Sequence, residues 1–134
     1  MKRAALAALL LAGLATGAVV PETPVEQVAL TEAINICDCP GQVAFLGRFP
    51  DGKDLPDSLF AKLEPRARLG KLSTKPSNTG VVIHLSEPKS AERNEVLVTY
   101  EVLTGDLGSR GVRLRLRRSG TGWKIIDSEL LWIS

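Results

Sequence analysis

The sequence has few of the residues from which most catalytic and metal-binding sites are built. It contains two cysteines, one histidine, one tyrosine and one methionine among its 134 residues. So small a set forms no recognisable catalytic triad, metal-ligand cluster or phosphate-binding loop. We therefore expect no metal and no cofactor, and an enzyme is the less favoured class of function.

Aromatic residues are scarce as well, at 4% of the chain. Isoleucine, leucine and valine must therefore form most of the hydrophobic core. Aromatic side chains do not alternate with the basic ones, so stacking surfaces for single-stranded nucleic acid are missing. We expect no nucleic acid partner. The chain also lacks internal repeats and low-complexity tracts.

The N-terminal segment has the pattern of a secretory signal peptide. Two basic residues, an apolar run and several small residues follow one another over residues 1–18. We predict cleavage after Ala18, with a second register one residue earlier. The alternative is an uncleaved anchor helix over residues 4–20, which is short for a bilayer span. We therefore expect a periplasmic or secreted protein that meets a membrane only during export.

The net charge gives no further reason to expect nucleic acid. The whole chain has 17 basic and 15 acidic residues, and removal of Lys2 and Arg3 with the signal peptide leaves 15 of each. The charge is nevertheless divided along the chain. Residues 19–65 hold 8 acids and 3 bases, whereas residues 66–134 hold 7 acids and 12 bases. The two halves either pair internally or make the molecule dipolar, which favours self-association.

Residues 24–134 are predicted to form a single domain after a short leader over residues 19–23. Capping signals and periodicity predict a helix over residues 24–37 and a second over residues 56–63. Residues 42–49 fit either a short strand or a helical turn. Strands are predicted over residues 80–85, 95–103, 112–117 and 123–133. This order predicts an α+β fold, with N-terminal helices packed on a curved antiparallel sheet of three to four strands.

The C-terminal half carries a family resemblance. Its motifs are the strand Val98-Thr99-Tyr100-Glu101-Val102, the alternating arginine-rich strand over residues 112–118, and the closing Gly122-Trp123-Lys124-Ile125-Ile126-Asp127. Over residues 90–134 the chain resembles the cystatin-like α+β superfamily, and more narrowly secreted domains of the nuclear-transport-factor-two-like type. The resemblance implies helices on a curved sheet and, in the enzymes of the group, a cone-shaped cavity with a carboxylate beside a Tyr or His. It implies no particular activity, because the group also includes non-enzymatic binding and dimerising domains.

The motif Cys37-Asp38-Cys39 is the most unusual local feature. A disulfide within it would close a small, strained and reducible ring. The two thiolates could instead bind a soft metal such as copper(I) with His84, or one of them could bridge to a second subunit. A structural crosslink or two separate thiols is the favoured interpretation, because two cysteines and one distant histidine are too few for a closed metal site.

A basic patch is predicted on the arginine-rich strand. The period of two places Arg113, Arg115 and Arg117 on one face, and a two-residue hairpin would place Lys124 opposite Arg117. Arg110 belongs to the same run of basic residues. We interpret the patch as a solvated sheet face. The functional alternative is an anionic partner, such as an acidic protein surface, a polymer or a lipid head group.

Asp127, Glu129 and Tyr100 are the weak catalytic candidates. In the same hairpin register, Asp127 and Glu129 would face the core, where burial raises the pKa of a carboxyl group toward that of a general base. A β-bulge would instead return both acids to water. His84 lies in an apolar strand and is expected to be structural.

The last strand has apolar side chains on both faces, in the run Leu130-Leu131-Trp132-Ile133. A homodimer through the sheet would cover one of these faces. The favoured hypothesis is therefore an exported, non-enzymatic module that binds a partner protein or self-associates. The alternatives are a small periplasmic enzyme whose cone-shaped pocket uses a carboxylate, and a thiol redox or soft-metal protein acting through Cys37 and Cys39.

Overall fold

A computed structural model describes residues 23–37, 43–63, 68–77, 79–104 and 108–134. The expected signal peptide and most of the expected leader lie outside these residues. Within them, no helix has the length and apolarity needed to cross a membrane.

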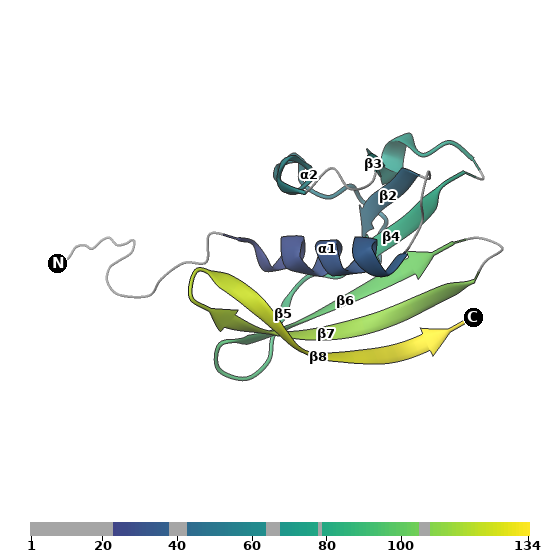
Figure 1. Ribbon diagram of the computed structural model, residues 1–134. Helices are drawn as coiled ribbons and strands as arrows, with labels where there is room; N and C mark the ends of the chain where they lie inside the picture. Colours follow the sequence, from purple (N-terminus) through teal and green to yellow (C-terminus); the bar gives the residue numbers. More distant parts are fainter. Residues whose placement is uncertain (1–22, 38–42, 64–67, 78, 105–107) are drawn as a thin grey trace.

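The described residues form one mixed sheet with the longest helix packed on one side of it (Figure 1). The helical elements are α1 (Val25–Cys37), α2 (Asp57–Lys62) and the short 3-10 helix η1 (Leu72–Thr74). The strands are β2 (Val43–Arg48), β3 (Arg68–Lys71), β4 (Val81–Leu85), β5 (Lys89–Ser90), β6 (Glu95–Leu103), β7 (Ser109–Ser119) and β8 (Gly122–Ile133). Their order across the sheet is β3-β2-β4-β6-β7-β8, and β5 pairs with β6 beyond the end of β4.

This architecture corrects the predicted fold. We expected an antiparallel sheet of three to four strands, but the sheet has seven strands and β2 runs parallel to both β3 and β4. The molecule is mostly sheet, and only α1 is longer than six residues. The missed strands β3 and β5 have four and two residues, too few to display a periodic pattern.

The second half of the sheet follows the alternation in the sequence. Strands β4, β6, β7 and β8 lie within a few residues of the predicted positions. In β4, buried and half-buried residues alternate throughout. Cross-strand pairs such as Val98↔Leu114 and Tyr100↔Val112 put apolar side chains on one face, here called the inner face. The opposite face, here called the outer face, carries the alternate polar residues.

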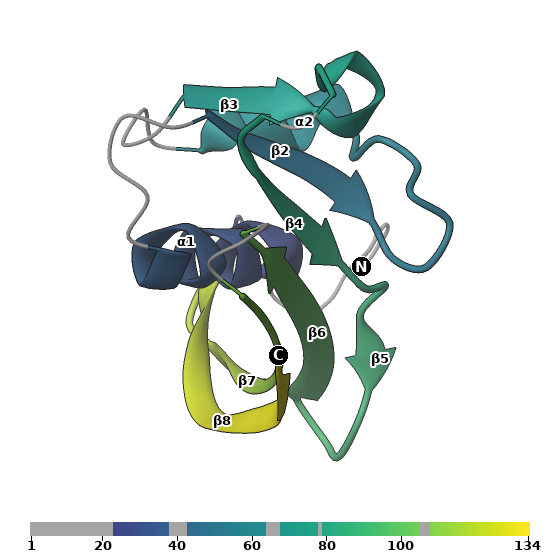
Figure 2. The ribbon, with the colours of Figure 1, turned by 90° about the vertical axis from the view of Figure 1, so that its right-hand side faces the viewer.

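The core lies between the inner face and α1. Seen along the sheet, the strands bend round α1, with β3 at one extreme and β8 at the other (Figure 2). The helix meets the sheet through Ala29, Leu30 and Ala33, all fully buried. Two of these three are alanines, whose small side chains let the helix approach the strands closely. Leu59 of α2 belongs to the same core.

Strand β2 is covered on both faces. Ala44 and Leu46 point into the core, while Phe45 lies on the outer face against Gly70 and Gly80. All four central residues of β2 are therefore buried. A continuous apolar run is typical of parallel strands that are covered on both sides. The sequence of residues 42–49 was ambiguous for this reason.

Arg48 ties the start of α1 to the sheet. Its guanidinium forms an ion pair with Glu26 of α1 and donates a hydrogen bond of 3.3 Å to the carbonyl oxygen of Ser86. The side chains of Arg48 and Glu26 are only 14% and 20% exposed. This half-buried contact fixes α1 across the end of β2 and the chain segment that follows β4.

Candidate functional site

The residues of the predicted basic patch lie on one face, as expected, but its three arginines are each paired with a carboxylate. Arg113, Arg115 and Arg117 share the outer face of β7, and Lys124 lies opposite Arg117. Arg113 pairs with a carboxylate of β8, that of Glu129. The other two arginines share Glu95, at 2.9 Å from Arg115 and 2.7 Å from Arg117.

Glu95 is the centre of this ion-pair group. Its side chain is only 9% exposed. Hydrogen bonds from Arg117 and Arg115 hold the pKa of the Glu95 carboxyl below its usual range, although burial opposes them. An anionic partner would have to displace this internal carboxylate. The arrangement therefore favours a solvated, internally balanced face.

Two β-bulges place the acids of β8 on the outer face. The register between β7 and β8 shifts between Arg115 and Leu116, and again nearer the end of β8. After the first shift, Asp127 lies opposite Arg115 and Glu129 opposite Arg113. The two acids are exposed, whereas Tyr100 is fully buried on the inner face. The three weak catalytic candidates thus lie on opposite faces of the sheet and form no common site.

His84 and Glu101 are neighbours on the outer face. The Nδ1 atom of His84 lies 3.4 Å from Oε1 of Glu101. This contact agrees with a structural histidine, as the sequence suggested. Cys37 is the last residue of α1, but Cys39 lies outside the described residues, and the thiol interpretations stay predictions. Among the described residues, no group of three metal-ligating side chains is present.

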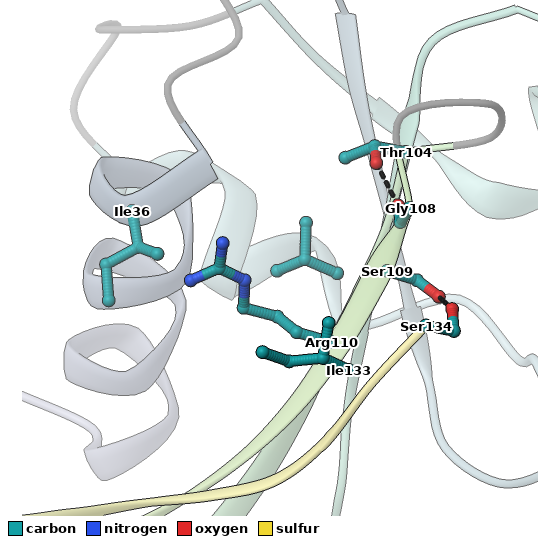
Figure 3. Close-up of a pocket in the computed structure, with 8 residues that line it drawn as sticks. Ile36, Thr104, Gly108, Ser109, Arg110, Ile133 and Ser134 are labelled. Carbon is teal, nitrogen blue, oxygen red and sulfur yellow. Dashed lines mark hydrogen bonds between the residues drawn. The ribbon is translucent and has the colours of Figure 1, made fainter.

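A pocket opens where the C-terminal end of α1 faces the ends of β7 and β8 (Figure 3). Its volume is about 110 Å³. The lining residues are Ile36, Val102, Thr104, Gly108, Ser109, Arg110, Ile133 and Ser134. This space is below the roughly 300–1,000 Å³ of sites for drug-sized ligands. None of the predicted catalytic residues lines it.

Arg110 is the charged residue of this pocket. It pairs with Val102 on one side and Ile133 on the other, which places it on the inner face. Its side chain extends from β7 toward α1, near Ile36 (Figure 3). The sequence could have separated Arg110 from the patch, because residue 110 has the opposite parity to residues 113, 115 and 117.

Tyr100 lies beside this pocket on the inner face. Within the described part of the chain, its buried hydroxyl has no hydrogen-bond partner. Burial raises the pKa of this hydroxyl, the negative charge of Glu32 raises it further, and the positive charge of Arg110 lowers it. Glu32 and Arg110 therefore both lie within electrostatic reach of Tyr100. Sequence reasoning did not connect these three residues, because they come from different elements.

The edge of β8 on the side away from β7 is a second candidate site. This strand of 12 residues pairs with β7 on one side and with no described strand on the other. Its last residues include three of the large exposed hydrophobic side chains of the molecule. Leu130 is 52% exposed, Leu131 41% and Ile133 68%.

Comparison of the chain with protein-family models, with curated proteins and with solved structures gave no match. The resemblance to cystatin-like and nuclear-transport-factor-two-like domains therefore stays a sequence-based expectation.

Proposed function

We propose that the protein is an exported, non-enzymatic module that self-associates by pairing β8 with β8 of a second copy. The observation that carries the proposal is the free edge of β8, with Leu130, Leu131 and Ile133 exposed at its end. A long edge strand presents unpaired backbone donors and acceptors to another strand. Exposed apolar groups beside such an edge favour its use as an interface.

The apolar residues of β8 also select a register. Two antiparallel copies related by a two-fold axis between residues 131 and 132 would place Leu130 opposite the partner's Ile133. Both side chains lie on the inner face, since Leu130 pairs with Val112 and Ile133 with Arg110. Antiparallel neighbours on one face pack directly against each other. The symmetric arrangement then makes this contact twice.

A competing register would place Lys124 opposite the partner's Glu129. It would match opposite charges, but an exposed ion pair contributes only about 0.2–1 kcal/mol. Full burial of one leucine or isoleucine contributes about 1.5–3 kcal/mol. Burial of side chains therefore favours the hydrophobic register, which pairs residues 130–133 of β8. It also leaves Lys124, Asp127 and Glu129 in water.

The test is the oligomeric state of the domain, measured by analytical ultracentrifugation over a range of concentrations. The substitutions L130K and I133E are each expected to raise the dimer dissociation constant by tenfold or more, because a charge replaces a buried apolar contact. The double variant L130K/I133E places opposite charges against each other and is expected to recover part of the affinity. A monomeric wild-type protein at all concentrations would refute the proposal.

The matched control on the same strand is K124E. It lies outside the proposed pairing and is expected to leave the dissociation constant unchanged. Loss of the dimer in K124E, with L130K unaffected, would replace the proposed register by the competing one.

Export is the second part of the proposal. It is supported by the basic, apolar and small residues that follow one another over residues 1–18. Mass spectrometry of the protein recovered from a bacterial periplasm tests it. The expected N-terminus is Val19, and recovery of only the full-length chain would count against cleavage.

A further inference from the structure

Arg110 differs from the other arginines of the same strand. Arg113, Arg115 and Arg117 each pair with a carboxylate on the outer face. Among the residues that the structure describes, no side chain pairs with the guanidinium of Arg110. A guanidinium presents a planar fork of donors that fits a carboxylate with two parallel hydrogen bonds. Within the described ranges of the chain, Arg110 is therefore available to bind such a group.

The pocket beside Arg110 suits a ligand with an apolar part. Ile36, Val102 and Ile133 supply aliphatic groups from three different elements, beside a lining that is otherwise mostly polar. Of the hydroxyl groups in the lining, that of Thr104 donates to the carbonyl oxygen of Gly108, and those of Ser109 and Ser134 lie 2.6 Å apart, so only one of the two serine protons is used in this contact (Figure 3). One cation and aliphatic groups match a monovalent anion with an alkyl group better than a phosphate, which needs several donors.

The size of the pocket limits the ligand. Its volume of about 110 Å³ is well below the roughly 300–1,000 Å³ of sites for drug-sized ligands. Only a handful of non-hydrogen atoms fits such a space. A short alkyl chain with one acidic group is of this size.

Tyr100 lies near the pocket but does not line it. It lies two residues along β6 from the pocket residue Val102, on the same face of the sheet. Its hydroxyl is buried without a partner among the described residues. Buried polar groups in native proteins are nearly always satisfied, so the partner of this hydroxyl is either a ligand or a bound water molecule, and only the first supports a site here.

We propose that this pocket binds a short-chain aliphatic carboxylate, with the carboxylate held by Arg110 and the alkyl chain against Ile36, Val102 and Ile133. The inference does not depend on self-association, because every group that it uses belongs to one copy of the chain.

The test is a titration of the domain with butyrate, followed by NMR chemical shifts of the residues around the pocket. Acetate lacks the longer alkyl chain, 1-butanol lacks the charge, and inorganic phosphate lacks both the alkyl chain and the planar carboxylate. Butyrate is expected to bind at least tenfold more tightly than each of the three. Equal binding of phosphate, or equal binding of 1-butanol, would overturn the proposal, as would no shift with butyrate.

Variants distinguish butyrate binding in the pocket from general attraction to the positive charge of β7. Arg110→Met is expected to weaken butyrate binding by tenfold or more, whereas the control Arg113→Met on the outer face leaves it unchanged. Ile36→Trp fills the cavity from an exposed helix position without altering the charge, and is expected to abolish binding. Butyrate affinity that survives both Arg110→Met and Ile36→Trp would assign the ligand to another place.

Two aspartates of the chain itself, Asp38 and Asp106, lie outside the described residues. The same titration on Asp38→Asn and Asp106→Asn shows whether an internal carboxylate competes for Arg110. We expect both variants to bind butyrate with the wild-type affinity. A large gain of affinity in either variant would mean that the chain supplies the anion, and would overturn the proposal of a free ligand.

Discussion

The two halves of the sheet share one core, but their outer faces are covered to different extents. In the parallel half, formed by β2, β3 and β4, Phe45 and Leu72 cover the outer face against glycines. In the antiparallel half, formed by β6, β7 and β8, the outer face carries the ion pairs of Glu95 and Glu129. One half is therefore closed on both sides, and the other is open to water on one side.

The two edges of the sheet differ in the same way. The edge strand β3 has four residues, and its Lys71 forms an ion pair of 2.8 Å with Asp57 of α2. Strand β8 has 12 residues and ends in exposed apolar side chains. Short, charged edges discourage strand pairing, whereas long apolar edges permit it. The parallel half therefore ends in a short, charged edge, whereas the antiparallel half ends in the long apolar edge on which the proposed self-association depends.

The largest expected effect comes from truncating the same residue type in each half. Leu46 of β2 is fully buried and Leu130 of β8 is 52% exposed. Leu46→Ala is expected to lower the free energy of unfolding by about 2–5 kcal/mol, because it leaves a cavity. Leu130→Ala is expected to lower it by less than about 0.5 kcal/mol in the monomer. Urea unfolding at low protein concentration measures both, and similar losses would erase the distinction between the halves.

The sequence revealed the open half more clearly than the closed half. In β7 the alternation of Leu114 and Leu116 with arginines marks one buried face, so the strand and its outer arginines were predicted. In β2 the run from Ala44 to Leu46 is buried on both faces and does not alternate, so periodicity could not separate strand from helix. The parallel pairing of β2 with β3 and β4 was not predicted, because residues 42–49 could not be assigned to a strand.

The candidate site was harder to predict than the strands. A regular hairpin register would put Asp127 on the inner face, but the favoured alternative, a β-bulge that returns it to water, is the one found, with the shift after Arg115 placing Asp127 on the outer face. The Arg110 pocket joins α1, β6, β7 and β8, which meet only in the folded chain. The exposed end of β8 was predicted, because apolar residues on both faces of a last strand can be seen in the sequence.

The next largest effect on stability is expected from substituting two glycines that have positive φ angles. Gly80, at the start of β4, has φ +75°, and a Cβ there would lie 2.5 Å from the carbonyl oxygen of Val43. Gly120, in the turn between β7 and β8, has φ +59° and open space around it. Gly120→Ala is expected to destabilise by about 1–2 kcal/mol through backbone strain alone.

Gly80→Ala adds a steric clash to the same strain, and overpacking contributes a further 1–3 kcal/mol or so. Thermal unfolding of the two variants side by side measures the difference. Gly120→Ala is expected to be the more stable of the two variants, by more than about 1 kcal/mol in the free energy of unfolding. Equal melting temperatures would mean that the closed half is no more tightly packed around Gly80 than the hairpin turn is.

A smaller effect is expected from the pH dependence of the ion pairs in the open half. The pKa of Glu95 is lowered in the folded protein by hydrogen bonds from Arg117 and Arg115. This group therefore stabilises the fold above the unfolded pKa of about 4.3, and the contribution is lost as the pH falls through the lower folded pKa. Below about pH 4.3, the free energy of unfolding of Glu95→Gln is expected to fall less steeply with decreasing pH than that of the wild-type protein.

The control for this prediction is Glu92→Gln, an exposed glutamate in the turn before β6. Urea midpoints measured from neutral pH into the acid range should have the wild-type slope in Glu92→Gln and a shallower one in Glu95→Gln. A wild-type slope in both variants would show that the outer ion pairs do not couple to folding.

The smallest expected effect is that of Tyr100→Phe, at the boundary between the core and the Arg110 pocket. Removing a buried hydroxyl without a partner relieves a desolvation penalty, so the free energy of unfolding is expected to stay the same or rise by up to about 1 kcal/mol. Val98→Ala, at an equally buried position of β6, should instead lower it by about 2 kcal/mol. A loss of more than about 1 kcal/mol in Tyr100→Phe would mean that the hydroxyl is hydrogen-bonded in solution. A bound water molecule would then be its partner, and the orphan hydroxyl would no longer support a ligand at Arg110.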